Sequence, residues 1–254
     1  MNLRVEELMT DTQFEAIREE WNGLLSQSAN NEITLTWEWI HTWWGVFQDD
    51  TRRLMILAVR DQNDCLVGIA PFQLRTVYPY WFLSAINQLS FLASGEEEAD
   101  EICTDYLNFI IPRGCEAEVI SKIWEYLASD KAEAWDEILL DAVSRDSENV
   151  RHLRAVVGSQ PRCYYEEVLN GRCYFIQLPA TWDAFMKNLD NKFRSNYRYR
   201  LKRASAKGKL TYTLAKTPQA LKEGFGLLTS LHQSRWIGKG KEGVFSSKKI
   251  QFVS

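Results

Sequence analysis

The sequence predicts an α/β fold built on a mixed sheet, and three observations lead to this. Apolar residues spaced three or four apart, as in helices, alternate along the chain with short apolar runs typical of strands. Two early runs, Leu54–Arg60 and Leu66–Leu74, flank the polar turn Asp61–Asp64, which indicates an antiparallel hairpin. A later strand–helix–strand order is typical of helices that pack on a sheet.

The first part of the chain contains the elements of one complete unit. Thr10 or Asp11 can cap a helix in which Phe14, Trp21 and Leu25 recur on one side. In chain order we expect a strand at 3–8, helices at 10–25 and 37–47, strands at 54–60 and 66–74, apolar runs at 86–92 and 106–111 around an acidic loop, a helix at 116–129, a strand at 137–140, a helix from 146 or 147 to 157, and a strand at 163–169.

The second part contains the beginning of another unit. Thr181 can cap a long helix that we expect to reach Lys207, because Gly208 can take the positive φ that ends a helix. The other expected elements are strands at 173–178 and 210–215, a helix from 217 to about 236, a loop rich in glycine and lysine at 238–243, and a helix capped by Ser246 or Ser247. That last helix has almost no chain left, so we expect the sequence to be truncated, with one full lobe and the first part of a second.

Charge divides the chain in the same place. Residues 1–170 hold 13 basic and 30 acidic residues, whereas residues 171–254 hold 17 basic and 4 acidic residues. We therefore expect two domains, an acidic one at 1–170 and a basic one at 171–254. Either the two domains dock on each other, or the basic one offers a surface to an anionic substrate, cofactor or nucleic acid.

Composition and motifs exclude several classes of protein. The amino terminus has acidic residues where a secretory signal is apolar, and no apolar run is long enough to cross a bilayer, so we expect a cytoplasmic protein. Five widely spaced cysteines without a C-x-x-C pair argue for reduced thiols and against a zinc site. Dinucleotide, P-loop, zinc-protease and nucleophile-elbow motifs are absent. His41, His152 and His232 fall in separate helices, so no metal or catalytic triad is expected.

Two helices carry candidate binding residues. The tryptophan-rich helix at 37–47 either anchors the core or presents a stacking platform for a sugar or base. The helix after Thr181 places an apolar stripe beside a basic one, and Arg200 falls within the angular range of the apolar stripe. Arg200 therefore needs a partner, and an anion in a cleft would be one. The apolar stripe is Trp182, Met186, Leu189, Phe193, Tyr197, Leu201 and Ala204, and the basic stripe is Lys187, Arg194, Arg198 and Lys202, with Lys192 and Arg203 on the other flank.

Several stretches of the sequence resemble a known family. The run R-C-Y-F-I-Q-L-P-A-T-W-D-A-F-M-K-N-L, continued by N-K-F-R-S-N-Y-R-Y-R-L-K-R-A, resembles the start of the acetyltransferase domain of GNAT proteins related to cellulose-biosynthesis CelD. The stretch L-H-Q-S-R-W-I-G-K-G-K-E-G-V-F-S is similar to the family's later "H..RW...G..G.F" segment. In the first half, L-M-I-L-A-V-R and L-V-G-I-A-P-F-Q-L are similar to the family's "l.vl.v....lvGiaPl".

The resemblance implies two tandem GNAT-like lobes, related to the FemAB peptidyltransferases. It implies transfer of an acetyl or other acyl group from CoA, or from another activated donor, to an amine or hydroxyl acceptor, with a role in polysaccharide or cell-envelope metabolism. No catalytic residue is assigned. The expected substrate-binding residues are Arg194, Arg198, Arg200, Lys202, His232, Arg235 and Trp236.

The chain departs from the family at the cofactor loop. GNAT folds hold the CoA pyrophosphate on backbone N–H groups of a [QR]-x-x-G-x-[GA] loop at a helix start. The corresponding stretch here, Ile111–Ala117, lacks that spacing. We therefore expect no tight acetyl-CoA binding and an inactive chain. The alternatives are a non-catalytic module whose basic domain binds an anion such as RNA, and a degenerate enzyme kept as a scaffold; of the possible partners, nucleic acid is the less expected one.

Overall fold

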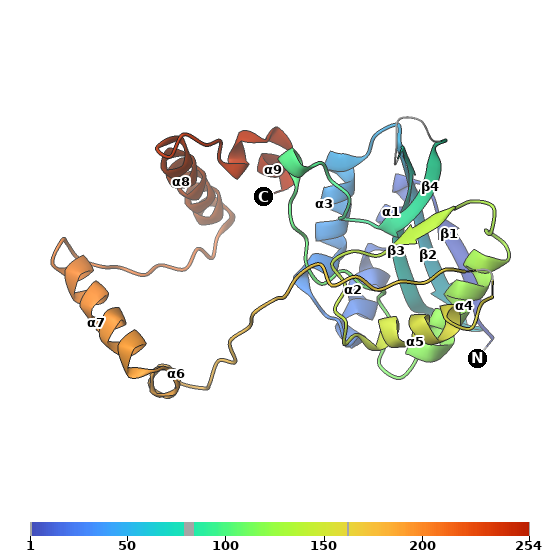
Figure 1. Cartoon of the computed structure of the whole chain (residues 1–254), viewed down its shortest axis with the longest axis horizontal. Coiled ribbons are helices and arrows are strands. Elements are labelled where there is room, and N and C mark those ends of the chain that lie inside the picture. Colours follow the sequence, from blue (N-terminus) through green and yellow to red (C-terminus); the bar gives the residue numbers. More distant parts are fainter. Residues whose placement is uncertain (1, 79–83, 162, 254) are drawn as a thin grey trace. The chain divides into compact units, whose positions relative to one another are not determined.

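The computed structural model describes residues 2–78, 84–161 and 163–253, and it divides into two compact units (Figure 1). The first unit comprises Met1–Tyr165 together with Thr229–Ser254, and the second comprises Glu166–Leu228. Residues 229–254, which the sequence analysis groups with the basic domain, thus cluster with the first unit. The predicted α/β class with a mixed sheet is confirmed, because helices pack on a five-stranded sheet that contains both pairings.

The sheet has the strand order β1-β2-β3-β4-β5. Its first three pairs are antiparallel, and β4 pairs with β5 in parallel across the crossover helix α4. The predicted hairpin is present as β2 and β3, which pair along almost their whole length. The bounds are β1 Arg4–Leu8, β2 Arg52–Arg60, β3 Leu66–Val77, β4 Ile86–Phe91, α4 Glu116–Ala128 and β5 Glu137–Leu139.

Helices cover both faces of this sheet. On one face, a Cβ added at Gly68 of β3 would collide with Val119 of α4, so glycine is what allows α4 to approach. Gln73, further along β3, points to the other face of the sheet. There Arg52 donates a hydrogen bond to Gln73 and lies against the ring of Trp43 in α3. The helices of that face are α1 Asp11–Ala16, α2 Arg18–Gln27 and α3 Trp37–Phe47, while α5 Glu148–Val157 packs beside α4.

The first predicted helix is interrupted once. Thr10 accepts from the backbone N–H of Gln13 and the Gln13 side chain returns to the Thr10 backbone, a capping box that starts α1 as expected. The helix breaks at Ile17, whose φ and ψ of −94° and 8° leave the helical region, and α2 continues from Arg18.

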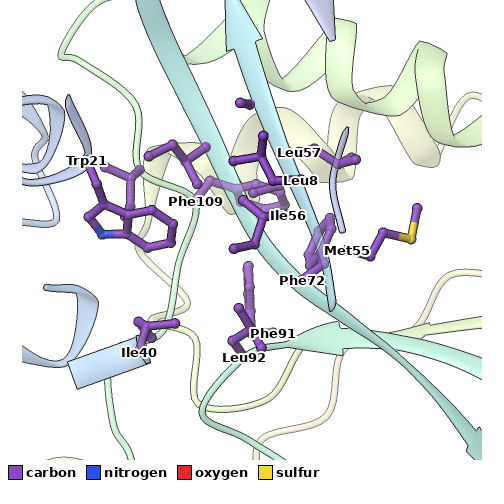
Figure 2. Packing of buried hydrophobic residues seen from close by; sticks show 14 of the residues in the cluster. Leu8, Trp21, Ile40, Met55, Ile56, Leu57, Phe72, Phe91, Leu92 and Phe109 are labelled. Carbon is purple, nitrogen blue, oxygen red and sulfur yellow. The ribbon is translucent and has the colours of Figure 1, made fainter. Parts of the chain in front are cut away.

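The core lies on both sides of the central strands and is rich in aromatic rings (Figure 2). Phe72, Phe91 and Phe109 contact one another, with Phe109 edge-on to the other two at 5.7 and 5.3 Å between ring centroids. Edge-to-face contacts of this kind add to the free energy of burying the rings. On the opposite face Trp21 is fully buried and its indole N–H donates to the Leu35 carbonyl at 2.8 Å, so its polar atom is satisfied.

The fourth position in the sheet is filled by two separate segments. The strand β4 pairs with the second half of β3, and residues 107–111 return to the first half, where Ile69 and Ile110 exchange backbone hydrogen bonds of 2.9 Å. The acidic loop between them includes the short 3₁₀ helix η2, Glu98–Asp100. The predicted apolar run at 106–111 is thus buried from Leu107 on, although it contributes one bridge rather than a full strand.

The second unit differs from the sequence prediction in two ways. The expected long helix is two helices, α6 Trp182–Asn188 and α7 Asn191–Ser205, because Leu189 is extended and the Asp190 carboxylate caps α7 by accepting from Phe193 N–H at 2.7 Å. The strands expected at 163–169, 173–178 and 210–215 are wrong: none of these described segments is assigned as a strand. A strand forms only where another backbone pairs with it in a ladder, and the ladders and bridges of the described residues do not include these segments.

The carboxyl-terminal residues of the first unit pack on α3. Helix α8, Pro218–Ile237, leads to the 3₁₀ helix η3, Val244–Ser246, and to α9, Lys248–Val253. Ser247 caps α9 as predicted and donates to Asp100 Oδ1 at 2.7 Å, while Ile250 is buried. This hydrogen bond, followed by contacts from Lys249, lowers the pKa of Asp100. Helix α9 is therefore held on α3 and η2 by one apolar and several polar contacts.

Among the helices of the described residues, none has the length and apolar character that crossing a membrane requires.

Candidate functional site

The amino end of α4 is where the resemblance would place a phosphate. Gly114 there has φ of +88°, so the loop that precedes α4 needs glycine at this position. The Gly114 N–H is not left for an anion, because the Glu116 carboxylate of this chain accepts from it at 2.7 Å. The next N–H, of Cys115, donates to the Pro112 carbonyl at 3.1 Å.

The charge of this turn is also unsuitable for a phosphate. Glu116 and Glu118 both lie in the first turn of α4, where carboxylates interact favourably with the helix dipole. A pyrophosphate would have to displace the Glu116 carboxylate and sit beside two negative side chains. The residues at the start of α4 therefore do not fit CoA.

The predicted basic residues of the second unit lie on α7 but do not act alike. The Arg194 guanidinium donates to the carbonyls of Met186 and Lys187 at 3.4 and 3.2 Å, so it caps the end of α6. Arg200 donates to the Asn196 side chain at 3.1 Å one turn earlier and is exposed. The buried charge that the single-helix prediction implied for Arg200 is therefore not found.

The remaining cations of α7 face solvent. Arg198 and Lys202 are exposed and lie one turn apart on one side of the helix. Arg203 lies 5.7 Å from the ring of Tyr199, which is 60% exposed. In the part of the chain that the structure describes, no ion pair includes a residue of α7. The free cations of α7 are thus available to an anion from outside this helix pair.

The end of α8 brings together three residues that the family-like motif contains. His232 Nε2 accepts from the Trp236 indole N–H at 2.9 Å, and the ring of Phe245 lies edge-on to His232 at 5.1 Å. Gly243 lies close to the end of the Gln233 side chain and to the His232 ring, which places the loop against α8. The motif H..RW...G..G.F therefore folds residues 232–245 into one compact turn.

This turn restricts the chemistry of His232. Because Nε2 accepts a hydrogen bond from Trp236, the neutral ring carries its proton on Nδ1, 3.2 Å from Gln233 Oε1. Both nitrogens are occupied, which suits a residue that positions a loop better than one that removes a proton. The exposed cations Lys239 and Lys241 lie 5.0 and 6.0 Å from the Trp236 ring, and Arg235 lies at 6.0 Å.

A buried polar cluster, which was not predicted from the sequence, joins residues 108–109 to the start of α5. Asn108 donates to Ser147 Oγ at 2.8 Å, and Asn149 donates to Asn108 Oδ1 and to the Phe109 carbonyl at 3.0 Å each. Asn149 is 1% exposed and its Oδ1 has no hydrogen-bond partner among the described residues. The available signal was one asparagine within the apolar run at 107–111.

A second missed cluster fixes the acidic loop to the sheet. The Arg52 side chain, 4% exposed, donates to Gln73 Oε1 at 3.1 Å and to the Gly95 carbonyl at 2.7 Å. Its guanidinium lies 5.5 Å from the ring of Trp43, whose N–H donates to Glu96 at 2.5 Å. Burial lowers the pKa of Arg52. All these partners belong to the chain, so we read this cluster as structural.

The two alternatives for the tryptophan-rich helix are resolved by burial. Trp37, Trp43, Trp44 and Phe47 are buried in α3, which favours the core anchor over a stacking platform. Trp37 stacks on His41 at 4.1 Å, so that histidine is also part of the packing. No group of potential metal ligands occurs among the described residues.

The cysteines and surface hollows add no site. All five cysteines are free thiols, and burial, followed by nearby acidic groups, raises the pKa of Cys103. Two open hollows are lined by described residues of the first unit. One of about 510 Å³ is lined by Asn2, Leu3, Ala117, Glu118, Ser121, Lys122 and Glu125, and one of about 440 Å³ by Asn2, Arg4, Asp61, Gln62 and Asp64.

Comparison with known proteins gives likenesses at the level of structure alone. No family model matches the chain, and no curated protein matches it. Solved structures similar to it include an aminoglycoside antibiotic 6'-N-acetyltransferase from Acinetobacter baumannii, with 10% identity, a TM-score of 0.37 and coverage of 71% of this chain and 100% of that one. A ribosomal-protein-alanine N-acetyltransferase from Brucella melitensis has 15% identity, a TM-score of 0.35 and coverage of 69% and 99%.

A third similar structure is an aminoglycoside acetyltransferase from an uncultured soil metagenomic sample, with 16% identity, a TM-score of 0.38 and coverage of 71% and 100%. At TM-scores below 0.5 these likenesses carry no argument about the activity of this chain.

Proposed function

We propose that this protein is a GNAT-type acyltransferase, similar to the CelD-related and FemAB-related tandem proteins. It would transfer an acetyl or other acyl group from CoA, or another activated donor, to an amine or hydroxyl acceptor of polysaccharide or cell-envelope metabolism. The observation that carries the proposal is connectivity. Four strands pair antiparallel in chain order, and the parallel strand β5 then follows across α4, which is the order that the resemblance implies.

The first unit is proposed as a structural lobe that does not hold the donor. Its α4 amino end is occupied by the Glu116 carboxylate, which takes the N–H that a phosphate would need. We assign the anionic part of the substrate to α7, whose cations Arg198, Arg200 and Lys202 are exposed and make no ion pair among the described residues. In the net reaction the acceptor nitrogen or oxygen bonds to the acyl carbon, the bond from that carbon to the donor's carrier breaks, and the acceptor's proton leaves with the carrier.

His232 and Trp236 are proposed to position the loop at 238–246 rather than to act on substrate, because their hydrogen bond occupies the ring nitrogen that a base would use. We propose a cytoplasmic location, in keeping with the five free thiols.

The test is transfer from acetyl-CoA to a panel of aminosugars, polyamines and oligosaccharides, followed by mass spectrometry, with this chain and with a relative that carries the [QR]-x-x-G-x-[GA] loop. We expect acceptors that gain one acetyl group with the relative and none with this chain, because the Glu116 carboxylate takes the N–H that the donor phosphate would need. Alanine at the positions of Arg198 and Arg200 in the relative should raise KM or lower kcat. Absence of any acetylated product with the relative would overturn the proposed activity.

A further inference from the structure

Helix α7 carries a high share of the positive charge of the second unit. Residues 191–205 contain six lysines or arginines and no aspartate or glutamate. The acid that precedes the helix, Asp190, is engaged in capping it. The whole unit, residues 166–228, has 12 basic and 5 acidic residues, so half of its cations lie on this one helix.

Contacts with α6 leave the cationic side of α7 free. Tyr197 packs on Trp182 of α6 at 5.6 Å between ring centroids, and Arg194 donates to the last carbonyls of α6. These two contacts show that α7 faces α6 with the side that carries Tyr197 and Arg194. Tyr199 lies elsewhere on the helix, about 160° from Tyr197 at the 3.6-residue period.

On that free side, an aromatic ring is flanked by cations. On the helical wheel Arg198 and Lys202 lie to one side of Tyr199, while Lys192 and Arg203 lie to the other. Tyr199 is 60% exposed, and the Arg203 guanidinium is 5.7 Å from its ring. Arg198 and Lys202 are separated by one turn, about 6 Å along the axis. An exposed ring between two lines of cations can stack on an unpaired base while the cations contact the phosphates on both sides.

We propose that α7 binds single-stranded nucleic acid, with Tyr199 stacked on a base and Arg198, Lys202, Lys192 and Arg203 on the backbone phosphates. A duplex would hide the base faces that Tyr199 could reach. A membrane-bound helix would bind through its apolar side, where Phe193 and Leu201 are 54% and 45% exposed, so anionic vesicles are the competing ligand in the test below. The inference rests on the assignment of α7 as the anion-binding surface and is independent of acyl transfer.

The experiment measures the affinity of the full chain for a labelled oligouridine of about 12 nucleotides by fluorescence anisotropy, at salt concentrations from roughly 50 to 200 mM. Each phosphate contact contributes about 0.7 to the slope of log K against log salt for a single strand, so Arg198→Ala with Lys202→Ala should reduce the slope by about 1.4. Tyr199→Ala should weaken binding about 5- to 100-fold, and Tyr199→Phe should restore it.

The matched control is Lys216→Ala with Lys222→Ala, which removes the same charge from exposed positions of the same unit outside α7. This pair should leave the affinity and slope close to those of the unaltered chain. Equal losses in the two pairs, no binding at the lower salt concentration, or binding to phosphatidylserine vesicles without binding to the oligonucleotide would each overturn the proposal. The acetyl-transfer assay is not used here, so its failure would be a separate result.

Discussion

Replacing Arg52 with methionine should destabilise the first unit by about 2–3 kcal/mol. The side chain is buried, and its guanidinium donates to Gln73, to Asp49 and to the Gly95 carbonyl. Gly95 keeps a donor in the variant, because Arg75 also bonds to its carbonyl at 2.8 Å. Gln73 Oε1 is left buried without a donor, which costs about 1–3 kcal/mol of unfolding free energy. Part of this loss is offset because the variant no longer buries a cation.

Urea unfolding followed by tryptophan fluorescence is a suitable assay, because Trp43 lies against Arg52 and reports on this region. For a unit of this size, the expected loss corresponds to a fall in melting temperature of about 5–10 °C. The control is Arg53→Met, one residue along β2 and exposed, which should change stability by less than about 0.5 kcal/mol.

The reasoning would be refuted if the two methionine variants unfolded at the same urea concentration. A double variant gives a second test. Because Gln73→Leu removes the acceptor that Arg52→Met leaves without a donor, the two changes together should cost clearly less than their sum. Additive losses would mean that Arg52 acts only through its packing.

Three further outcomes are expected. Gly68→Ala should cost about 1–3 kcal/mol in urea unfolding, because its Cβ would collide with Val119. The hydrogen bond from Arg60 lowers the pKa of Glu20 below 4.5. The stabilisation that this ion pair contributes is therefore present above that pH and is lost as the pH falls through the folded-state pKa. We expect Glu20→Gln to flatten the fall in urea midpoint between about pH 6 and about pH 3.5. Asp190→Ala should remove the cap of α7 at about 1 kcal/mol, seen as roughly fivefold faster amide exchange in that helix.

Each of these has a control. Gly23 of α2 has open space around its Cβ position, so Gly23→Ala should be neutral or stabilising by up to about 1 kcal/mol. Glu19→Gln removes an exposed acid next to Glu20 and should retain the pH dependence. Thr181→Ala uncaps α6, and equal effects of Thr181→Ala and Asp190→Ala on exchange in α7 would contradict the assignment of that cap.

Local patterns predicted the first unit well because its elements are defined by their own residues. Thr10 caps α1 and the tryptophan-rich helix spans 37–47, both as predicted from side-chain type and spacing. The hairpin β2–β3 follows from two apolar runs and a polar turn. The break at Ile17 could not be predicted, because nothing in its residue type distinguishes it from a helical position.

The errors in the second unit have the opposite cause. Apolar runs at 173–178 and 210–215 have strand-like composition, yet a strand exists only where another backbone pairs with it. The Asp190-Asn191 pair was available as a capping signal inside the long helix, but the continuous apolar stripe outweighed it.

The candidate site was predictable in its charges and not in its contacts. The excess of basic residues on 191–205 is visible in the sequence. That Arg194 caps α6, whereas Arg198 and Lys202 stay free, depends on how the chain turns at Leu189. The polar cluster of Asn108 and Asn149 joins residues 41 positions apart and has no local signature.

The split fourth strand gives this protein a place where its length can vary. Both halves are anchored on β3, one through β4 and the other through Ile110, so the sheet keeps its register whatever lies between them. Relatives should therefore tolerate gained or lost residues within 96–106, provided that the Gly95 carbonyl still reaches Arg52, Glu96 still accepts from Trp43 and Asp100 still accepts from Ser247. A foreign peptide inserted there should be displayed at the surface without disturbing the fold that carries it.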